Sequence, residues 1–220
     1  MSKLGLIHTV SKLGTTFAEL TEELLPTVET IVISDELLLK RTVRDGEIDS
    51  VTRDRLRAHV AALTEYGVDG VLVTCSSVGG VVDDIARNAE VPVLRVDLAM
   101  AERAVELGTR IGVLATLPTT LSPTAAVIES AARAAGREVT VIPRLCEGAF
   151  FALDRGDTAR HDAIIAEELD SLLAEVDVVV LAQASMARIA AMRPIDGSRV
   201  LSSPRLAVER LATQGPFLSE

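Results

Sequence analysis

Short apolar runs alternate along this chain with longer amphipathic segments. An unbroken aliphatic run of roughly four to eight residues is typical of a buried parallel strand, whereas apolar residues three and four apart indicate one face of a helix. Leu56, Val60 and Leu63 show the helical spacing. The pattern predicts strands at 4–10, 30–33, 71–74, 93–96, 111–115, 138–142, 177–182 and 199–202, and helices at 16–25, 51–66, 80–89, 99–107, 161–174, 186–192 and 204–213.

One further helix is predicted from the signals at its ends. Ser122 is a favoured N-cap residue, Pro123 suits a first turn, and Gly136 suits the position after a last turn. Strands that alternate with helices favour parallel sheets with right-handed crossover connections. Ligands of such sheets bind at the carboxyl ends of the strands, so the residues there are the candidates for a site.

Three strand segments of the first half recur in the second half in the same order. The segment 68–78 aligns with 176–186, 4–10 aligns with 111–117, and 93–97 aligns with 200–204. All three alignments share nearly the same offset, which is roughly half the chain. This offset is too long for a solenoid repeat, whose period is ~20–50 residues, and it indicates a tandem duplication. The predicted fold class is α/β, with two pseudo-symmetric halves that are each a parallel sheet flanked by helices. We expect these halves to be 1–97 with 205–220, and 98–204, with the active site in the cleft between them.

Composition narrows the class of protein. The 220 residues are 48% apolar but only 2% aromatic, so aliphatic side chains must form the core. The net charge of −10 disfavours nucleic acid and anionic membranes as partners, because both attract basic surfaces. No apolar run reaches the length of about 18 residues that a membrane span needs. With two cysteines and no signal-peptide pattern, we expect free thiols and a cytoplasmic protein.

The duplicated strands differ in the residue that follows them. Cys75 follows the strand of the first half, and Gln183 takes the same place in the second. Between a strand and a helix, backbone N–H groups and the helix dipole stabilise a thiolate, and the same N–H groups can bind a carboxylate. We therefore interpret Cys75 as a reactive thiol rather than as one of the buried structural cysteines that apolar strands also contain.

The histidines and the second cysteine carry weaker indications. His8 ends the first strand, where it either faces the site or bonds locally, and both interpretations stay open. We expect His59 to be structural and His161, which opens a helix, to lie at the surface. Cys146 lies in a loop after a strand, where its apolar neighbours favour packing over a role in the site. No metal-ligand spacing, nucleotide-binding motif or nucleophile elbow is present.

Two motifs resemble those of the aspartate/glutamate/hydantoin racemase superfamily, which has maleate isomerase and arylmalonate decarboxylase relatives. They are VTCSS at 73–77 and RIGVLAT at 110–116, which is followed by Thr119-Thr120. The resemblance covers essentially the whole chain. It implies two pseudo-symmetric α/β halves that each deliver a cysteine, and cofactor-independent chemistry at the α-carbon of a small carboxylate. The candidate site residues are Cys75 and His8 for catalysis and Thr9, Thr74, Ser76, Ser77, Thr116, Thr119, Thr120, Gln183, Ala184 and Ser185 for substrate binding.

The chain departs from that family where Gln183 replaces the second cysteine. An amide neither takes nor gives a proton, and racemisation needs removal on one face of the α-carbon and delivery on the other. We therefore expect an isomerase or racemase-type enzyme that uses a single thiol, a small carboxylate substrate and no cofactor. A decarboxylase or other lyase, and a non-catalytic binder of small acids, are the alternatives. A second base such as His8 would restore a racemase, and assembly into a homo-oligomer stays open.

Overall fold

The structure, a computed structural model, describes residues 1–192, 199–214 and 216–217. Its internal contacts divide the chain into two compact units, Met1–Val96 with Pro204–Glu220, and Asp97–Ser203. Residues 193–198, 215 and 218–220 lie outside the described residues, and so do the parts of the expected halves 98–204 and 205–220 that contain them. Each unit is described below by itself.

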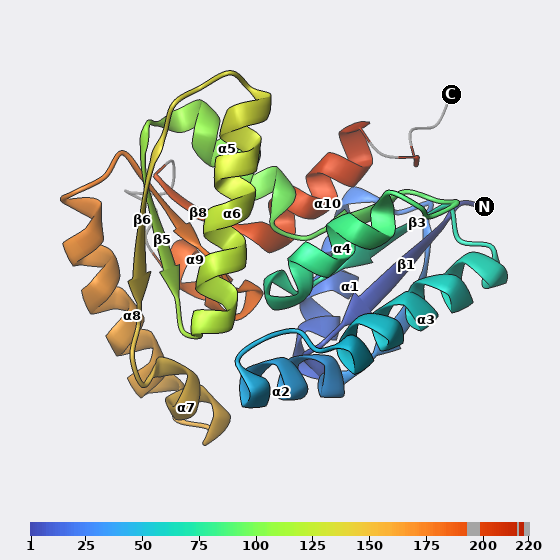
Figure 1. Cartoon of the computed structure of the whole chain (residues 1–220), viewed down its shortest axis with the longest axis horizontal. Helices are drawn as coiled ribbons and strands as arrows, with labels where there is room; N and C mark the ends of the chain where they lie inside the picture. The colour runs from blue at the N-terminus through green and yellow to red at the C-terminus, as the bar shows by residue number, and fades with distance from the viewer. Residues whose placement is uncertain (193–198, 215, 218–220) are drawn as a thin grey trace. The chain divides into compact units, whose positions relative to one another are not determined.

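The first unit contains a four-stranded parallel sheet in the order β2-β1-β3-β4, of which β1 and β3 are labelled in Figure 1. Helices connect the strands, as a parallel sheet requires. The strands are β1 (Lys3–His8), β2 (Glu29–Ser34), β3 (Gly70–Val73) and β4 (Val93–Arg95). The helices are α1 (Gly14–Leu24), α2 (Glu36–Asp45), α3 (Ser50–Tyr66), α4 (Gly79–Ala86) and α10 (Ser203–Gln214), with short 3-10 helices η1 (Ser11–Leu13) and η2 (Ser76–Val78).

The second unit repeats this topology, with a parallel sheet in the order β6-β5-β7-β8. The strands are β5 (Arg110–Ala115), β6 (Thr140–Leu145), β7 (Val178–Leu181) and β8 (Val200–Ser202). The helices are α5 (Leu98–Leu107), α6 (Pro118–Ala134), α7 (Ala149–Asp154), α8 (Thr158–Leu173) and α9 (Ala187–Ala191), with the 3-10 helix η3 (Ala184–Met186). The predicted fold class, α/β with a parallel sheet in each half, is confirmed. The strands and helices predicted from periodicity are present, with ends within about three residues of the predicted ones.

One packing detail recurs at the centre of both sheets. A Cβ atom on Gly5 of β1 would lie 2.9 Å from Leu63 Cδ1, and one on Gly112 of β5 would lie 2.6 Å from Leu172 Cδ2. Leu63 belongs to α3 and Leu172 to α8, so each helix presses a leucine against the glycine of a central strand. The duplication inferred from the sequence therefore extends to the contacts of single side chains.

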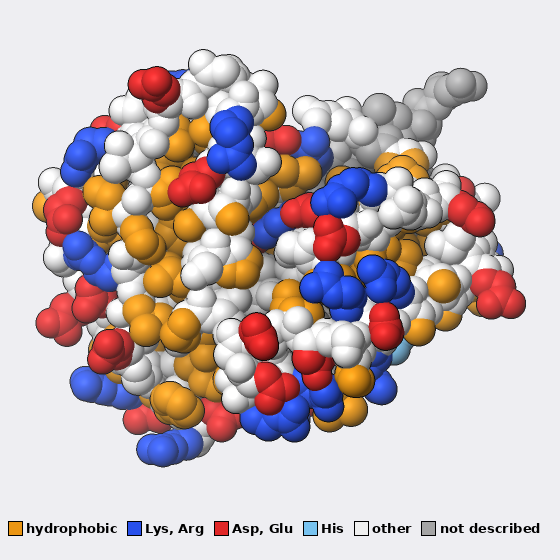
Figure 2. Space-filling view, viewed as in Figure 1, with side chains coloured by type: hydrophobic (Ala, Val, Ile, Leu, Met, Phe, Trp, Pro, Cys, Tyr) orange, Lys and Arg blue, Asp and Glu red, His pale blue; other side chains and the backbone are white. Residues whose placement is uncertain are grey.

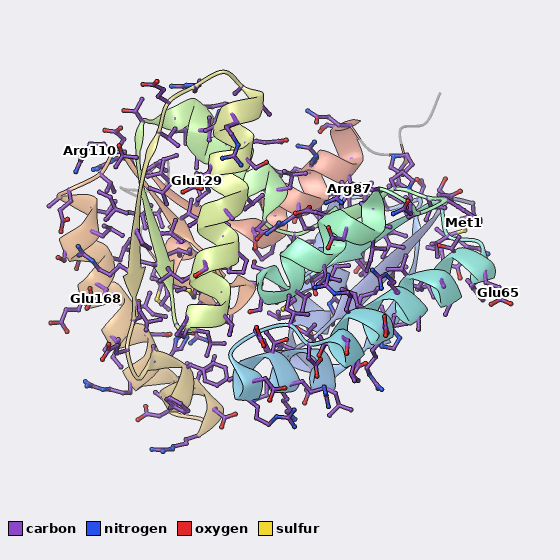
Figure 3. All side chains as sticks on the ribbon, in the orientation of Figure 1. Met1, Glu65, Arg87, Arg110, Glu129 and Glu168 are labelled. Atoms are coloured by element: carbon purple, nitrogen blue, oxygen red, sulfur yellow. The ribbon has the colours of Figure 1, made fainter. Side chains whose placement is uncertain are left out.

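An aspartate before β3 and another before β7 make matching contacts with a neighbouring strand. Asp69 accepts a hydrogen bond from the Lys3 N–H at 2.7 Å. Asp177 accepts hydrogen bonds from the N–H groups of Thr109 and Arg110, each at 2.9 Å. Figure 3 marks Arg110 at the start of β5. These carboxylates satisfy backbone donors that would otherwise be left over where the strand ladders begin.

Helix α2 was not predicted, and its sequence explains why. Asp35 caps it by accepting the Leu37 N–H at 3.1 Å, and Gly46, with φ 76°, ends it. Its two buried residues are Leu38 and Thr42, and because threonine is polar the apolar side chains alone do not mark the buried face. Helix α7 was missed as well, because it has only six residues, in a segment predicted as a loop.

Helix α6 begins earlier than predicted. Pro118 takes the first helical position, where its missing N–H needs no partner, and two N–H groups of the next turn donate to the Leu117 carbonyl at 3.1 Å. Pro123 therefore lies inside the helix, and Ser122 does not cap it. Gly136, with φ 63°, does follow the end of the helix, which confirms that part of the prediction.

The surface carries charges of both signs. On the face drawn in Figure 2, Lys and Arg side chains are interspersed with Asp and Glu side chains. Among the described residues, no helix is long and apolar enough to cross a membrane.

Candidate active site

Cys75 lies directly after β3, where the chain turns into η2 and then α4. Only 8% of its surface is exposed. The Thr9 hydroxyl, the Ser77 hydroxyl and the N–H groups of Ser77 and Val78 hydrogen-bond to the sulfur. Thr9 follows β1, the strand next to β3, so two neighbouring strand ends contribute to the surroundings of this thiol.

Burial raises the pKa of the Cys75 thiol, whereas the hydrogen bonds from Thr9, Ser77 and Val78 lower it. The net direction is upward, which contradicts the expectation that the turn makes this thiol acidic. The strand that carries Cys75 to the turn also removes it from water, and desolvation disfavours the thiolate. At neutral pH the group is therefore a thiol, and a thiol can donate a proton.

His8 ends β1, and its Nδ1 lies 2.8 Å from the Thr74 hydroxyl. The same hydroxyl lies 3.1 Å from the Ile7 carbonyl. When it donates its hydrogen to that carbonyl, it accepts from a protonated Nδ1, which places the lone pair of the neutral ring on Nε2. Burial lowers the pKa of His8 and favours this neutral form. The ring also packs on Phe17, with centroids 5.5 Å apart.

Two polar atoms at the ends of β1 and β3 are buried without a hydrogen-bond partner among the described residues. One is Nε2 of His8 and the other is Oγ of Ser76. His8 thus bonds locally through Nδ1, and its role in the site stays a prediction. The structure brings together six of the predicted site residues in the first unit: His8, Thr9, Thr74, Cys75, Ser76 and Ser77.

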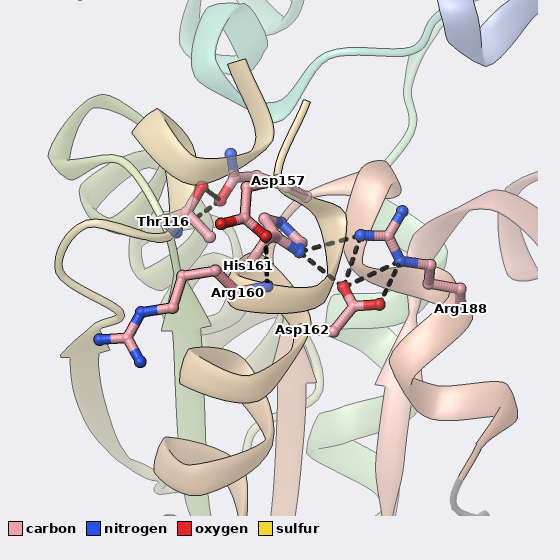
Figure 4. Close-up of polar contacts among 7 residues, drawn as sticks. Thr116, Asp157, Arg160, His161, Asp162 and Arg188 are labelled. Carbon is pink, nitrogen blue, oxygen red and sulfur yellow. Dashed lines mark hydrogen bonds and ion pairs between the residues drawn. The ribbon is translucent and has the colours of Figure 1, made fainter. Parts of the chain in front are cut away.

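In the second unit, Gln183 follows β7 as Cys75 follows β3. Its Oε1 accepts two hydrogen bonds from Thr116, one from the N–H at 2.6 Å and one from the hydroxyl at 2.9 Å (Figure 4). Since both donors occupy the same oxygen, the amide is fixed with its NH2 group as the remaining donor. Thr116 follows β5, so its pairing with Gln183 repeats the pairing of Thr9 with Cys75.

The other predicted residues of the second unit lie at helix starts. Thr119 and Thr120 are in the first turn of α6, and the buried Oγ1 of Thr119 has no partner among the described residues. Ala184 and Ser185 form part of η3 and are half-buried.

A family model for Asp/Glu/hydantoin racemases matches residues 9–211. The chain belongs to the Asp/Glu/hydantoin racemase family. The resemblance inferred from the sequence is thereby confirmed, and membership of this family supports a racemase- or isomerase-type function. A search of curated proteins finds no match to the chain.

Solved structures of this fold include racemases and a decarboxylase. Allantoin racemase from Klebsiella pneumoniae is similar with a TM-score of 0.72 and 17% identity, over 100% of this chain and 94% of that one. Glutamate racemase isoform RacE1 from Bacillus anthracis is similar with a TM-score of 0.72 and 18% identity, over 96% of this chain and 80% of that one. Unliganded arylmalonate decarboxylase is similar with a TM-score of 0.60 and 15% identity, over 98% of this chain and 94% of that one. At these identities the likeness concerns the fold.

Within this member of the racemase family, His161 is not at the surface as expected. It is fully buried, and its Nδ1 lies 2.8 Å from Asp162 Oδ1 and 3.0 Å from Arg188 Nη2 (Figure 4). The residues four and eight positions later, Ile165 and Leu169, are buried on α8 as well. His161 is therefore the first member of the apolar stripe of α8, and that spacing was the signal for its burial.

The remaining candidates have structural surroundings. His59 Nε2 lies 2.6 Å from the Asp35 carboxylate, which also caps α2. Cys146 is fully buried in an apolar cluster, and burial, followed by the charge of Glu168, raises its pKa to about 12. Packing, the favoured interpretation of Cys146, agrees with this. In the described part of the chain, no three His, Cys, Asp or Glu side chains are grouped to hold a metal ion.

Arg95 is not among the predicted site residues, and its side chain is buried at the end of β4. It lies in the run Val-Leu-Arg-Val, which predicts a strand and says nothing of the direction of the arginine side chain.

Proposed function

We propose that this protein is a cofactor-independent isomerase that moves a proton at the α-carbon of a small carboxylate, with Cys75 as its one reactive thiol. The observation that carries the proposal is the setting of the Cys75 sulfur, which takes hydrogen bonds from Thr9 at the end of the neighbouring strand and from the Ser77 and Val78 N–H groups of the following turn. Family membership directs the choice of chemistry.

The protonation states favour a division of work between His8 and Cys75. A neutral imidazole with its lone pair on Nε2 can take the α-proton, which leaves a planar enediolate. A neutral Cys75 thiol can then return a proton to the α-carbon. The imidazolium and the thiolate that result regain their first states when a proton passes between them or through solvent, so no electron acceptor is required.

The hydroxyl groups of the site divide into two roles in this proposal. Thr74 positions His8, because both its donor and its acceptor are used within the protein. Thr9 positions the sulfur of Cys75. Ser76 remains to bind a substrate oxygen through its hydroxyl. That hydrogen bond becomes stronger as negative charge develops on the substrate oxygen.

We assign Gln183 to binding rather than to proton transfer. Its oxygen is held by Thr116, so it offers N–H donors to a carboxylate or carbonyl oxygen. Thr119, Thr120, Ala184 and Ser185 remain candidates for the same task.

Decarboxylation is the second candidate function. It needs one proton donor and no base, and the raised pKa of the Cys75 thiol favours a donor. The fold of arylmalonate decarboxylase is also similar to that of this chain.

The test is incubation in D2O with a panel of small carboxylates, amino acids, hydantoins and malonates. NMR measures deuterium at the α-carbon. We expect α-deuteration of at least one compound without loss of carbon dioxide. Release of carbon dioxide with one-face deuteration would assign the lyase function instead. Binding without deuteration or turnover across the panel would contradict both enzymatic proposals. The matched control is Cys75→Ala, which has no thiol, with circular dichroism as the check that it is folded.

A further inference from the structure

Arg95 links the strand beside Cys75 to the helix that follows it. It is the last residue of β4 and pairs with Val73 of β3. Val73 precedes Cys75 by two residues. Only 4% of its side chain is exposed. Its Nη1 donates to Asp83 Oδ2 at 2.7 Å, and Asp83 is on α4.

The guanidinium also lies against Gly79, the first residue of α4. A Cβ atom on Gly79 would lie 2.9 Å from Nε of Arg95 and nearer still to Cζ and Nη2. A side chain at this position would therefore have to displace the guanidinium. The next residue, Gly80, has nothing within 4 Å of such a Cβ atom, so the requirement for glycine is confined to position 79.

This arrangement is unfavourable for helix α4 by itself. The first turn of a helix carries partial positive charge, so cations stabilise the other end. Asp83, on the same helix, pairs with the guanidinium and is 52% exposed. Packing on Gly79 joins Arg95 to the segment before α4 as well.

That segment carries the donors of the thiol. The Gly79 N–H closes η2 by donating to the Ser76 carbonyl. The two residues between them, Ser77 and Val78, direct their N–H groups to the sulfur of Cys75. A guanidinium packed on Gly79 therefore holds the far end of the turn that presents these donors.

We propose that Arg95 is a positioning residue for Cys75, which packs on Gly79 and pairs with Asp83 so that the Ser77 and Val78 N–H groups stay on the sulfur. It acts through the turn 76–79 and not by touching the substrate. The inference rests on the proposed role of Cys75 as the reactive thiol. Its test, however, measures thiol chemistry and needs no turnover.

The experiment is the pH dependence of iodoacetamide alkylation of Cys75 in the full chain, followed by mass spectrometry, with Cys146 as the internal reference. We expect Arg95→Met and Gly79→Ala each to move the midpoint upward by about one pH unit, which lowers the thiolate fraction about tenfold at a fixed pH below it. Arg95→Lys should have a midpoint close to that of Arg95→Met, because a flexible ammonium cannot replace a planar group packed on a backbone. The double variant of Arg95→Met and Gly79→Ala should shift the midpoint no further than either change alone.

Two controls accompany these variants. Gly80→Ala adds the same methyl group one residue later, where there is room. Arg87→Met removes an exposed arginine at the end of α4 that pairs with Asp84 at 2.8 Å. Both should keep the wild-type midpoint, and circular dichroism checks that every variant is folded. If Arg95→Met does not fold, the midpoints of Arg95→Lys and Gly79→Ala test the positioning role of Arg95.

Midpoints that stay at the wild-type value, or fall, in Arg95→Met and Gly79→Ala would overturn the inference. Equal shifts in Gly80→Ala would do so too. If the midpoints shift as expected but no carboxylate is turned over, the positioning role stands and the proposed function fails.

Discussion

Thr116 donates two hydrogen bonds to one side-chain oxygen of Gln183, at 2.6 Å from its N–H and 2.9 Å from its hydroxyl. In the other unit, Thr9 hydrogen-bonds to the sulfur of Cys75. A threonine after the first strand thus holds the residue after the third strand in both units. The duplication has kept this pairing and changed the chemistry of the partner, which is a thiol in one unit and an amide in the other.

Gln183→Cys tests this difference. If residue 183 contacts the reacting carbon, the new thiol adds a proton-transfer group to His8 and Cys75, so we expect faster α-proton exchange of the enantiomer that the wild type exchanges more slowly. Gln183→Ser is the matched control, because serine is similar in size to cysteine but is a poor base at neutral pH. Exchange is followed by NMR for each enantiomer in D2O. Equal exchange in the two variants would place residue 183 away from the reacting carbon.

The pH dependence of activity tests His8. Burial lowers its pKa below the usual 6.5, so the neutral base persists to lower pH than for an exposed histidine, and activity should fall only as pH drops through the lowered value. His8→Asn should reduce kcat by about 10²–10⁴-fold and remove this acid limb. A kcat/KM profile whose acid limb is unchanged in His8→Asn would rule out His8 as the base.

The same group links stability to pH. Because the folded-state pKa of His8 is lower, the unfolded chain binds more protons below pH 6.5, and the contribution of His8 to the free energy of unfolding is lost as pH falls. Thermal unfolding at pH 7 and pH 5 should therefore show a smaller pH effect in His8→Asn than in the wild type.

Alkylation separates the two cysteines. Burial raises the pKa of both thiols, but only Cys75 has hydrogen bonds that act in the opposite direction, and Cys146 is raised to about 12. We expect iodoacetamide to modify Cys75 first at pH 7.5, and a bound carboxylate to protect it. Peptide mass spectrometry measures both. Modification of Cys146 first would contradict the assignment of the site.

The glycine of each central strand is predicted to be a packing requirement. Gly112→Ala places a methyl group against Leu172, and overpacking of this kind costs about 1–3 kcal/mol of the free energy of unfolding. Leu172→Ala combined with Gly112→Ala should lose less stability than the two single changes added together. Gly14→Ala, where nothing lies within 4 Å, is the control. Denaturant titration gives the values, and additive losses would show that the two residues do not interact.

The duplication made most of the fold predictable, because the same apolar runs recur in the same order and both sheets follow them. What escaped prediction depends on contacts between residues distant in sequence. The hydrogen-bond partner of His8 is Thr74, 66 residues away. The direction of the Cys75 pKa follows from burial on all sides, which a strand end in the sequence does not reveal. His161 was different, since its spacing from Ile165 indicated burial and only its place at the helix start suggested exposure.

The central claim is that Cys75 returns the proton to the α-carbon, and the rate at which Cys75→Ala inverts that carbon tests it most directly. With a substrate found in the panel, wild type and variant are incubated in D2O, and the deuterium content and the configuration of the recovered acid are measured. We predict a loss of about 10²–10⁴-fold in the rate of deuteration with inversion in Cys75→Ala, with substrate binding retained. Gln183→Ala should keep inversion and change mainly KM. Inversion by Cys75→Ala at the wild-type rate would contradict the role of Cys75.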